Sequence, residues 1–245
     1  MKVFIQREGE QFSNINYLTA YLGFREFGYD VELYRWDEFD ALPVTRETIV
    51  SGGIPVVLKA LAKLGCPAPF LQAIPDSVAE FAGRSTWLST MADVRNRFAD
   101  ANAAPVFFKP LPHDTKLFNG TVARRFRDLI ATAHLPASLP VLCTAIVDFV
   151  SEYRVFILHR DAIGCRHYKG DFRLFPDFSV VDAAIEKFTD SSAACAMDFG
   201  VTREGRTLLV EVNDGYALGC YGLNEVRYAR MIEARWRELT GQPQE

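Results

Sequence analysis

The chain has 245 residues, of which 49% are hydrophobic, so it can bury one large core or two smaller ones. Its formal net charge is −4 at pH 7, which gives no excess of positive charge for holding a polyanion. We therefore expect neither a nucleic acid nor an anionic membrane surface as partner, and we expect a small molecule or a peptide instead.

The cysteines favour a reducing compartment. They are odd in number, form no C-x-x-C pair and mostly have apolar neighbours, which indicates reduced thiols and predicts a cytosolic protein. The first ten residues carry charges where a signal peptide needs an apolar run, and no stretch approaches the ~20 apolar residues of a membrane span. The five cysteines are Cys66, Cys143, Cys165, Cys195 and Cys220.

Residues 1–75 alternate between short apolar runs and segments with helical spacing. This order predicts a small α/β domain with a parallel sheet, and the Pro-rich segment at residues 66–75 predicts a linker behind it. The predicted strands are residues 3–5, 31–34 and 48–50. The predicted helices are residues 15–22, with Ser13 as N-cap and Gly28 as stop, and residues 55–64.

Residues 76–245 are predicted to form a second, α+β domain, because strand-like runs are closely spaced and turn residues separate them as in hairpins. The predicted strands are residues 106–109, 141–147, 153–158, 163–168, 193–199 and 207–213, and the predicted helices are residues 121–134, 182–189 and 224–239.

The last predicted hairpin carries the strongest chemical signal. If its turn is symmetric about Glu204-Gly205, Asp198 lies directly opposite Glu211, and Asn213 lies on the same face. Two facing carboxylates repel unless a cation or a proton lies between them, and Mg²⁺ suits such a pair. The alternate face would carry Met197, Phe199, Leu208, Val210 and Val212 as core residues. In the alternative interpretation, both acids are solvated charges on an exposed sheet face.

Basic residues precede the hairpin where an anionic ligand would need them. Lys109 ends a buried-looking strand, and Lys116 lies in the loop before Asn119-Gly120. Either lysine alone could also be an ordinary surface cation.

Glu152 and Arg154 share one face of another predicted strand. The partner strand brings Arg166 or His167 opposite Arg154, depending on the length of the turn near Arg160.

In this order the motifs resemble the ATP-grasp superfamily, and within it the clade named for one arginine and two lysines. The matching segments are Phe108-Lys109-Pro110, Lys116 with Asn119-Gly120, Glu152-Tyr153-Arg154, Asp198-Phe199-Gly200 and Glu211-Val212-Asn213, and the resemblance covers roughly residues 76 to 245.

The resemblance implies an ATP-grasp fold in which two α+β subdomains clamp ATP, behind a preceding small α/β domain. It implies Lys109 and Lys116 on phosphates, adenine against the backbone of Ala145, Ile146 and Val147, and Glu152 near the ribose. It further implies Asp198, Glu211 and Asn213 as magnesium ligands, and Arg154 with Arg166 at the transferred phosphoryl group.

Members of this superfamily mostly activate a carboxylate as an acylphosphate for attack by an amine. The sequence thus predicts an ATP- and Mg²⁺-dependent carboxylate-amine ligase acting on a small-molecule or peptide acceptor. Two alternatives remain open at this point: a phosphotransferase that uses the same nucleotide site, and a nucleotide-binding module without turnover.

Overall fold

The structure is a computed structural model that describes residues 1–9, 12, 14–111 and 117–243. Ser13 and Lys116 therefore lie outside the described residues. The chain forms two compact units, residues 1–81 together with 149–245, and residues 82–148. We call them the first and second unit and describe each by itself. The predicted boundary after residue 75 falls inside the first unit, so a separate domain at residues 1–75 stays a prediction.

The first unit begins with the predicted parallel sheet. Its strands are β1 (Lys2–Gln6), β2 (Asp30–Tyr34) and β3 (Thr48–Ser51), in the order β2-β1-β3. Helices α1 (Ile15–Glu26) and α2 (Ile54–Lys63) follow β1 and β3, which confirms both helix predictions. The side chain of Asn14 caps α1 by accepting a hydrogen bond from the backbone N–H of Asn16 at 2.9 Å.

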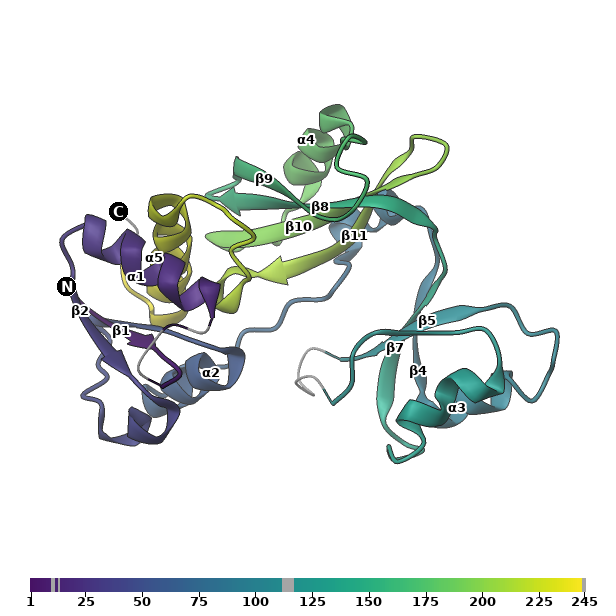
Figure 1. Cartoon of the computed structure of the whole chain (residues 1–245), viewed down its shortest axis with the longest axis horizontal. Coiled ribbons are helices and arrows are strands. Elements are labelled where there is room, and N and C mark those ends of the chain that lie inside the picture. The colour runs from purple at the N-terminus through teal and green to yellow at the C-terminus, as the bar shows by residue number, and fades with distance from the viewer. Residues whose placement is uncertain (10–11, 13, 112–116, 244–245) are drawn as a thin grey trace. The chain divides into compact units, whose positions relative to one another are not determined.

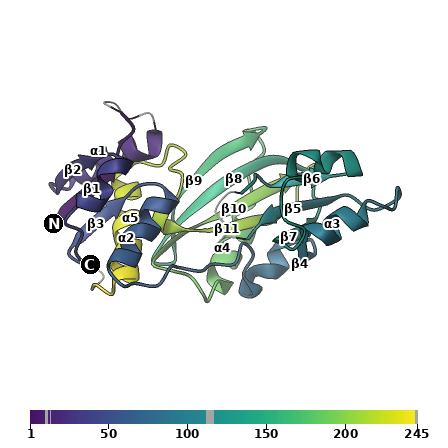
Figure 2. The same cartoon turned by 90° about the horizontal axis from the view of Figure 1, so that it is seen from below.

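A four-stranded antiparallel sheet forms the rest of the first unit (Figures 1 and 2). Its order is β11-β10-β8-β9, with β8 (Phe149–Leu158), β9 (Asp161–Gly170), β10 (Ala194–Thr202) and β11 (Thr207–Asp214). Helix α4 (Phe178–Lys187) packs on one face of this sheet through Val181 and Ala184. Helix α5 (Glu225–Thr240) starts at its N-cap Asn224 and contacts α1. Because α4 begins at Phe178, the helix predicted over residues 182–189 started about one turn too late.

The two sheets of the first unit share a core. Val3, Phe4 and Ile5 of β1 belong to the same buried cluster as Phe156 of β8 and Trp236 of α5. Gly23 allows the close approach of α1 to α5, because a Cβ there would meet the carbonyl oxygen of Glu225 at 2.1 Å. Phe156 lies on the face of the antiparallel sheet that also carries residues 152 and 154 of β8. The polar side chains described below lie on this face.

The second unit is a four-stranded antiparallel sheet in the order β4-β7-β5-β6. Its core lies on the side of the sheet covered by α3 and a 3-10 helix, where Met91, Phe108 and Leu129 are buried. The elements are β4 (Thr86–Thr90), α3 (Met91–Arg97), β5 (Val106–Pro110), β6 (Thr121–Ala123), the 3-10 helix η4 (Phe126–Thr132) and β7 (Pro140–Ala145).

The helix predicted over residues 121–134 is wrong. Thr121 and Val122 extend the sheet by pairing with Phe108 and Phe107, and only residues 126–132 turn into a 3-10 helix. The helical spacing of Val122, Phe126 and Ile130 misled the prediction, because Phe126 and Ile130 are exposed by 60% and 71% and form no buried stripe.

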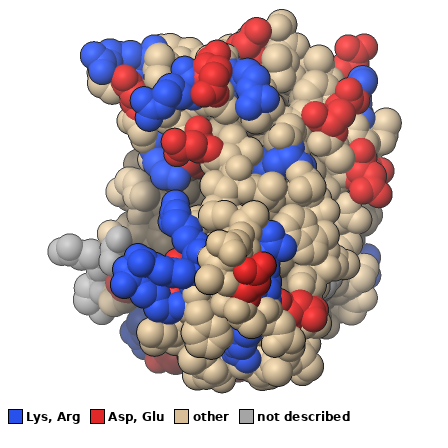
Figure 3. Space-filling view, turned by 90° about the vertical axis from the view of Figure 1, so that its right-hand side faces the viewer, with Lys and Arg blue, Asp and Glu red and all other residues tan. Residues whose placement is uncertain are grey.

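The described residues also form the 3-10 helices η1 (Trp36–Ala41), η2 (Asp76–Ala82) and η5 (Gly215–Ala217). Among the described residues, no helix combines the length and the apolar character needed to span a membrane. The molecular face shown in Figure 3 mixes Lys and Arg with Asp and Glu side chains, in keeping with the weakly acidic composition.

Candidate functional site

Four charged side chains form a row across the sheet of the first unit. Asp198 on β10 lies opposite Glu211 on β11 and, on its other side, opposite Arg154 on β8. Arg154 in turn lies opposite Arg166 on β9. Because directly opposed residues point to the same side of a sheet, the order Glu211, Asp198, Arg154, Arg166 lies on one face. We call this set the charged row.

The two central members of the charged row form a bidentate ion pair. Arg154 Nε donates to Asp198 Oδ1 and Arg154 Nη2 to Asp198 Oδ2, both at 2.7 Å, and the two residues are only 6% and 3% exposed. Burial raises the pKa of the Asp198 carboxyl, Arg154 offsets part of that rise, and the charge of Glu211 adds to it. Asp198 is therefore a carboxylate that depends on an adjacent cation.

Asn213 completes the acidic end of the charged row. Its Nδ2 donates to Asp198 Oδ2 and to Glu211 Oε1, both at 3.3 Å. The predicted grouping of Asp198, Glu211 and Asn213 on one face is confirmed, and the interpretation of both acids as fully solvated charges is wrong for Asp198.

The hairpin reaches this register by a different route from the predicted one. A three-residue loop, Arg203 to Gly205, connects the strands, since the Thr202 N–H donates to the Arg206 carbonyl at 2.9 Å. The register then shifts by one residue between Asp198 and Phe199, so Phe199 pairs with Leu209. Consequently Leu209 is the buried core residue, whereas the predicted Leu208 and Val210 are only partly buried.

The structure also settles the partner of Arg154. The loop between β8 and β9 has two residues, His159 and Arg160, both with positive φ, and the register then shifts by one residue between Phe156 and Ile157. Together the loop and this shift bring Arg166 and not His167 opposite Arg154. Two guanidinium groups in directly opposed positions repel unless an anion lies near them.

Both arginines keep donors for a ligand. Arg154 uses Nε and Nη2 for Asp198, and among the described residues no acceptor meets its Nη1. Arg166 donates from Nε to the Gly222 carbonyl at 2.9 Å and from Nη1 to the Cys165 carbonyl at 3.0 Å. Within the described part of the chain, no acceptor meets its Nη2. The basic end of the charged row can therefore hold an anion through planar, forked donors.

Glu152 lies two residues before Arg154 on the same face, as predicted, and is 7% exposed. Tyr168 donates its hydroxyl to Glu152 Oε2 at 2.9 Å, and Lys169 pairs with Glu152 Oε1. Burial raises the pKa of Tyr168, and the charges of Asp198 and Glu152 add to this rise, so its hydroxyl stays protonated.

Two aromatic neighbours of the charged row were missed from the sequence. Tyr168 could have been found, because it lies two residues after Arg166 and so shares its sheet face. Tyr221 belongs to the loop between β11 and α5, and its ring lies 4.7 Å from the Arg154 guanidinium carbon. Strand periodicity carries no signal for a residue in such a loop.

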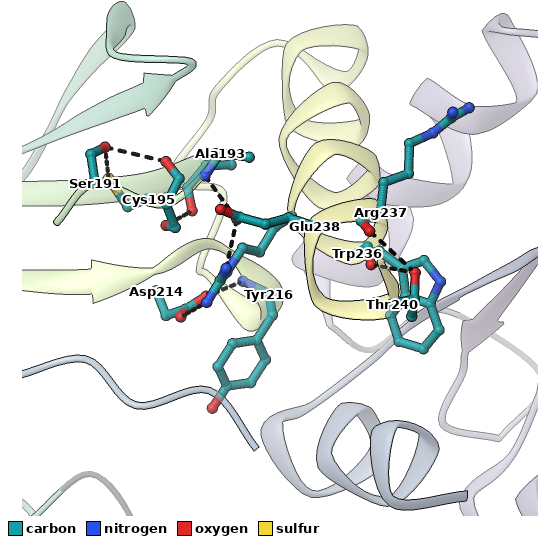
Figure 4. Close-up of polar contacts among 12 residues, drawn as sticks. Ser191, Ala193, Cys195, Asp214, Tyr216, Trp236, Arg237, Glu238 and Thr240 are labelled. Carbon is teal, nitrogen blue, oxygen red and sulfur yellow. Dashed lines mark hydrogen bonds and ion pairs between the residues drawn. The ribbon is translucent and has the colours of Figure 1, made fainter. Parts of the chain in front are cut away.

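An ion-pair network fixes the end of the β10–β11 ribbon next to Asn213 (Figure 4). Arg235 of α5 donates from Nε to Asp214 Oδ1 at 2.7 Å and from Nη1 to Glu238 Oε2 at 2.6 Å. Glu238 Oε2 also accepts from the Ala193 N–H at 2.8 Å, just before β10 begins. Because helix α5 thereby holds both strands at one end, the carboxylates of the ribbon have a rigid support.

The other predicted site residues belong to the second unit. Lys109 lies on β5 opposite Leu142, and the alternation along β5 puts it on the sheet face opposite the buried Phe108. Ala145 ends β7 and donates its N–H to the Ser85 carbonyl at 3.0 Å, and Ile146 and Val147 follow before β8. Their roles with a nucleotide stay predictions, as does that of Lys116.

The acidic end of the charged row fits a hard divalent cation. Carboxylate and amide oxygens are ligands that Mg²⁺ accepts. Asp198 Oδ1 has a second lone pair beyond its bond to Arg154, whereas Oδ2 accepts from both Arg154 and Asn213. Among the described residues, no three or more His, Cys, Asp or Glu side chains gather as a metal cluster. Two carboxylates and one amide instead suit an ion that keeps water and phosphate oxygens as its remaining ligands.

Three solved structures with a similar fold are named as synthetases or ligases. D-cycloserine synthetase DcsG superposes with a TM-score of 0.60 at 13% identity, over 96% of this chain and 100% of that chain. D-alanine–D-alanine ligase from Bacillus anthracis complexed with ATP gives a TM-score of 0.57 at 12% identity, over 100% and 99%. ATP-grasp ligase PsnB, complexed with minimal precursor, Mg and ADP, gives 0.52 at 12% identity, over 96% and 97%. At these identities the likeness shows the fold, and the predicted ATP-grasp fold is confirmed.

A comparison with curated protein sequences finds no match. The sequence does match a family directly, however, over residues 81–231, which is more than half of the chain and includes the whole charged row. The chain therefore belongs to the ATP-grasp domain family, R2K clade family 2.

Proposed function

We propose that this protein is an ATP-dependent ligase that converts a carboxylate into an acylphosphate, which an amine then attacks. The observation that carries the proposal is the charged row, in which two acids adjoin two arginines on one sheet face. The acids suit a divalent cation and the arginines suit a phosphoryl group, so one row provides for both parts of a Mg·ATP tail.

Asp198, Glu211 and Asn213 are the proposed Mg²⁺ ligands. When bound, Mg²⁺ would neutralise charge on the phosphate oxygens of ATP. Asp198 is held by Arg154 and Asn213 lies beside both acids, so the ligands are already gathered. The bonds from Arg235 to Asp214 and Glu238 keep this end of the ribbon in place.

Arg154 and Arg166 are the proposed catalytic residues. Their remaining N–H donors would meet the phosphoryl group as it passes from ATP to a carboxylate oxygen of the substrate, with ADP as the leaving group. The amine then displaces phosphate from the acyl carbon, and an amide bond forms. The protein contributes position and charge in this sequence, without a covalent enzyme intermediate.

Lys109 and Lys116 are proposed phosphate ligands, the backbone of Ala145, Ile146 and Val147 is a proposed adenine contact, and Glu152 is a proposed ribose contact. Glu152 is suited to this task because Tyr168 and Lys169 hold its carboxylate in one orientation. The names of the similar structures support an acceptor that is a small molecule or a peptide. We also propose a cytosolic location.

A turnover screen tests the ligase proposal. The protein is incubated with Mg·ATP and pools of amino acids and short peptides, and ADP, free phosphate and new masses are measured. A ligase yields equal amounts of ADP and phosphate with a new amide. A phosphorylated acceptor without phosphate release would identify a phosphotransferase instead, and absence of turnover across the pools would contradict both enzymatic readings.

Two variants tie the turnover to the charged row. Arg154→Lys and Arg166→Lys keep the positive charge but lose the planar fork, so we expect turnover to fall by roughly 10²-fold or more. The control is Arg173→Lys, because Arg173 is exposed and, among the described residues, its ion pair is with Asp171 alone. Equal turnover in all three variants would remove the catalytic assignment.

A further inference from the structure

The loop after β11, residues 215–222, is anchored to the body of the first unit at several points. The Cys220 N–H donates to Asn16 Oδ1 at 2.8 Å, and the Tyr228 hydroxyl donates to the Leu218 carbonyl. Arg166 Nε donates to the Gly222 carbonyl at 2.9 Å. A side chain presented by this loop is therefore held in a defined place.

Tyr221 occupies a backbone conformation that its side chain disfavours. Its φ is +44° and that of Gly222 is +79°, and the Leu223 N–H donates to the Cys220 carbonyl at 2.7 Å across them. Two positive φ values inside such a turn are the pattern of a type I′ turn, in which Asn, Asp or Gly is the favoured first residue. A bulky residue in this position points to a role for its side chain.

The ring of Tyr221 lies over the centre of the charged row. Its centroid is 4.7 Å from the Arg154 guanidinium carbon and 5.3 Å from the centroid of the Tyr168 ring. Arg154 is 6% exposed, whereas Tyr221 is 47% exposed. The ring thus covers the arginine on one side and faces solvent on the other.

These contacts fix the guanidinium group in three directions. Asp198 binds its Nε and Nη2, and the Tyr221 ring covers its plane. Among the described residues no acceptor meets Nη1, so Nη1 and the second N–H of Nη2 remain for a ligand. The two bonds to Asp198 and the aromatic contact together oppose a change in the orientation of this fork.

We propose that Tyr221 is a positioning residue that holds Arg154 with its Nη1 edge ready for an anionic oxygen of the reacting group. The strained turn places the ring over the guanidinium. This inference rests on the proposed function for the identity of the anion, but the hold on Arg154 is a property of the protein without substrate.

Two substitutions separate the ring from the turn. Tyr221→Phe keeps the ring and the strained backbone, whereas Tyr221→Asn removes the ring and suits a left-handed turn. We expect Tyr221→Asn to keep Tm or raise it by up to a few °C, while kcat falls roughly 2- to 30-fold, which corresponds to the free energy of one cation–π contact. We expect Tyr221→Phe to have the kcat of the wild type. The control is Trp36→Asn. Trp36 is also an exposed aromatic residue beside a cation, because Lys59 Nζ lies 5.4 Å from the centroid of its ring, but this pair lies away from the charged row.

A second measurement does not depend on turnover. The Nε–Hε NMR signal of Arg154, assigned with Arg154→Lys, should show an upfield ring-current shift in the wild type and in Tyr221→Phe, and lose it in Tyr221→Asn. An unchanged signal in Tyr221→Asn, or a lowered Tm with unchanged kcat, would show that Tyr221 only packs and would overturn the proposal. If the wild type turns over no ATP, the ligase proposal fails, and the NMR comparison still decides the role of Tyr221.

Discussion

Like charges lie next to each other twice in the charged row, and the structure shows how the protein tolerates this. Asp198 and Arg154, the two inner members, neutralise each other in a buried bidentate pair. Such a pair contributes little net stability compared with apolar residues, because both ions lose their hydration. Its retention on a sheet face that also carries Glu211 and Arg166 is better explained by ligand binding than by folding.

Arg154→Met would leave the Asp198 carboxylate buried without its partner. We expect the free energy of unfolding to fall by about 3–5 kcal/mol, measured by urea denaturation. Arg173→Met serves as the matched control, because the Arg173 side chain is 75% exposed and its ion pair with Asp171 is worth at most about 1 kcal/mol. Equal losses in the two variants would show that the buried pair is no more than a surface ion pair.

At the level of single strands, alternation predicted most of the charged row. Asp198, Glu211 and Asn213 follow from the polar and apolar alternation of the last hairpin, and Glu152 and Arg154 from that of β8. The prediction that Asp198 lies opposite Glu211 is correct, but it assumed a two-residue turn without a register shift. The loop is one residue longer than assumed, and the shift beside Phe199 compensates for it.

Features that depend on tertiary contacts could not be predicted from the sequence. The choice between Arg166 and His167 depends on a two-residue loop, His159 and Arg160, which is not the usual Asn-Gly, and on the register shift beside Phe156. Tyr221 reaches Arg154 only because the loop after β11 is anchored to α1 and β9. Neither feature has a local sequence pattern that would have revealed it.

Gly205 in the β10–β11 loop offers a test of this hairpin. Its φ is +80°, and a Cβ there would meet no atom within 4 Å, so any cost of substitution comes from the backbone. We expect Gly205→Ala to lower the free energy of unfolding by about 1–2 kcal/mol. Gly205→Asn should lose less, because Asn tolerates the left-handed region, and thermal unfolding can compare the two. Identical losses would argue against this loop conformation.

On the scale of the whole molecule, each unit has its own hydrophobic core. In the second unit Phe108 is fully buried among residues of α3, η4 and β7, and in the first unit Met197 is fully buried against α4. The mixed fold class followed from the order of elements in the sequence. The extent of the second unit did not, because β4 and α3 carry no strong pattern and residues 121–134 resemble a helix.

Phe108→Ala should therefore destabilise one unit. We expect a loss of about 3–5 kcal/mol, and amide hydrogen exchange should show reduced protection in residues 82–148 with little change in β8 to β11. Met197→Ala should produce the reverse distribution. Loss of protection throughout the chain in both variants would show that the two cores unfold as one.

Isothermal titration calorimetry with Mg²⁺ and a nonhydrolysable ATP analogue can decide whether the acidic end of the charged row binds the metal-bound tail of a nucleotide. We expect Asp198→Asn and Glu211→Gln each to weaken binding by about 30-fold or more, because each removes a charge that holds the metal. Glu204→Gln, in the exposed loop of the same hairpin, should bind like the wild type. Undiminished affinity in both Asp198→Asn and Glu211→Gln would show that these acids do not hold the metal-bound nucleotide.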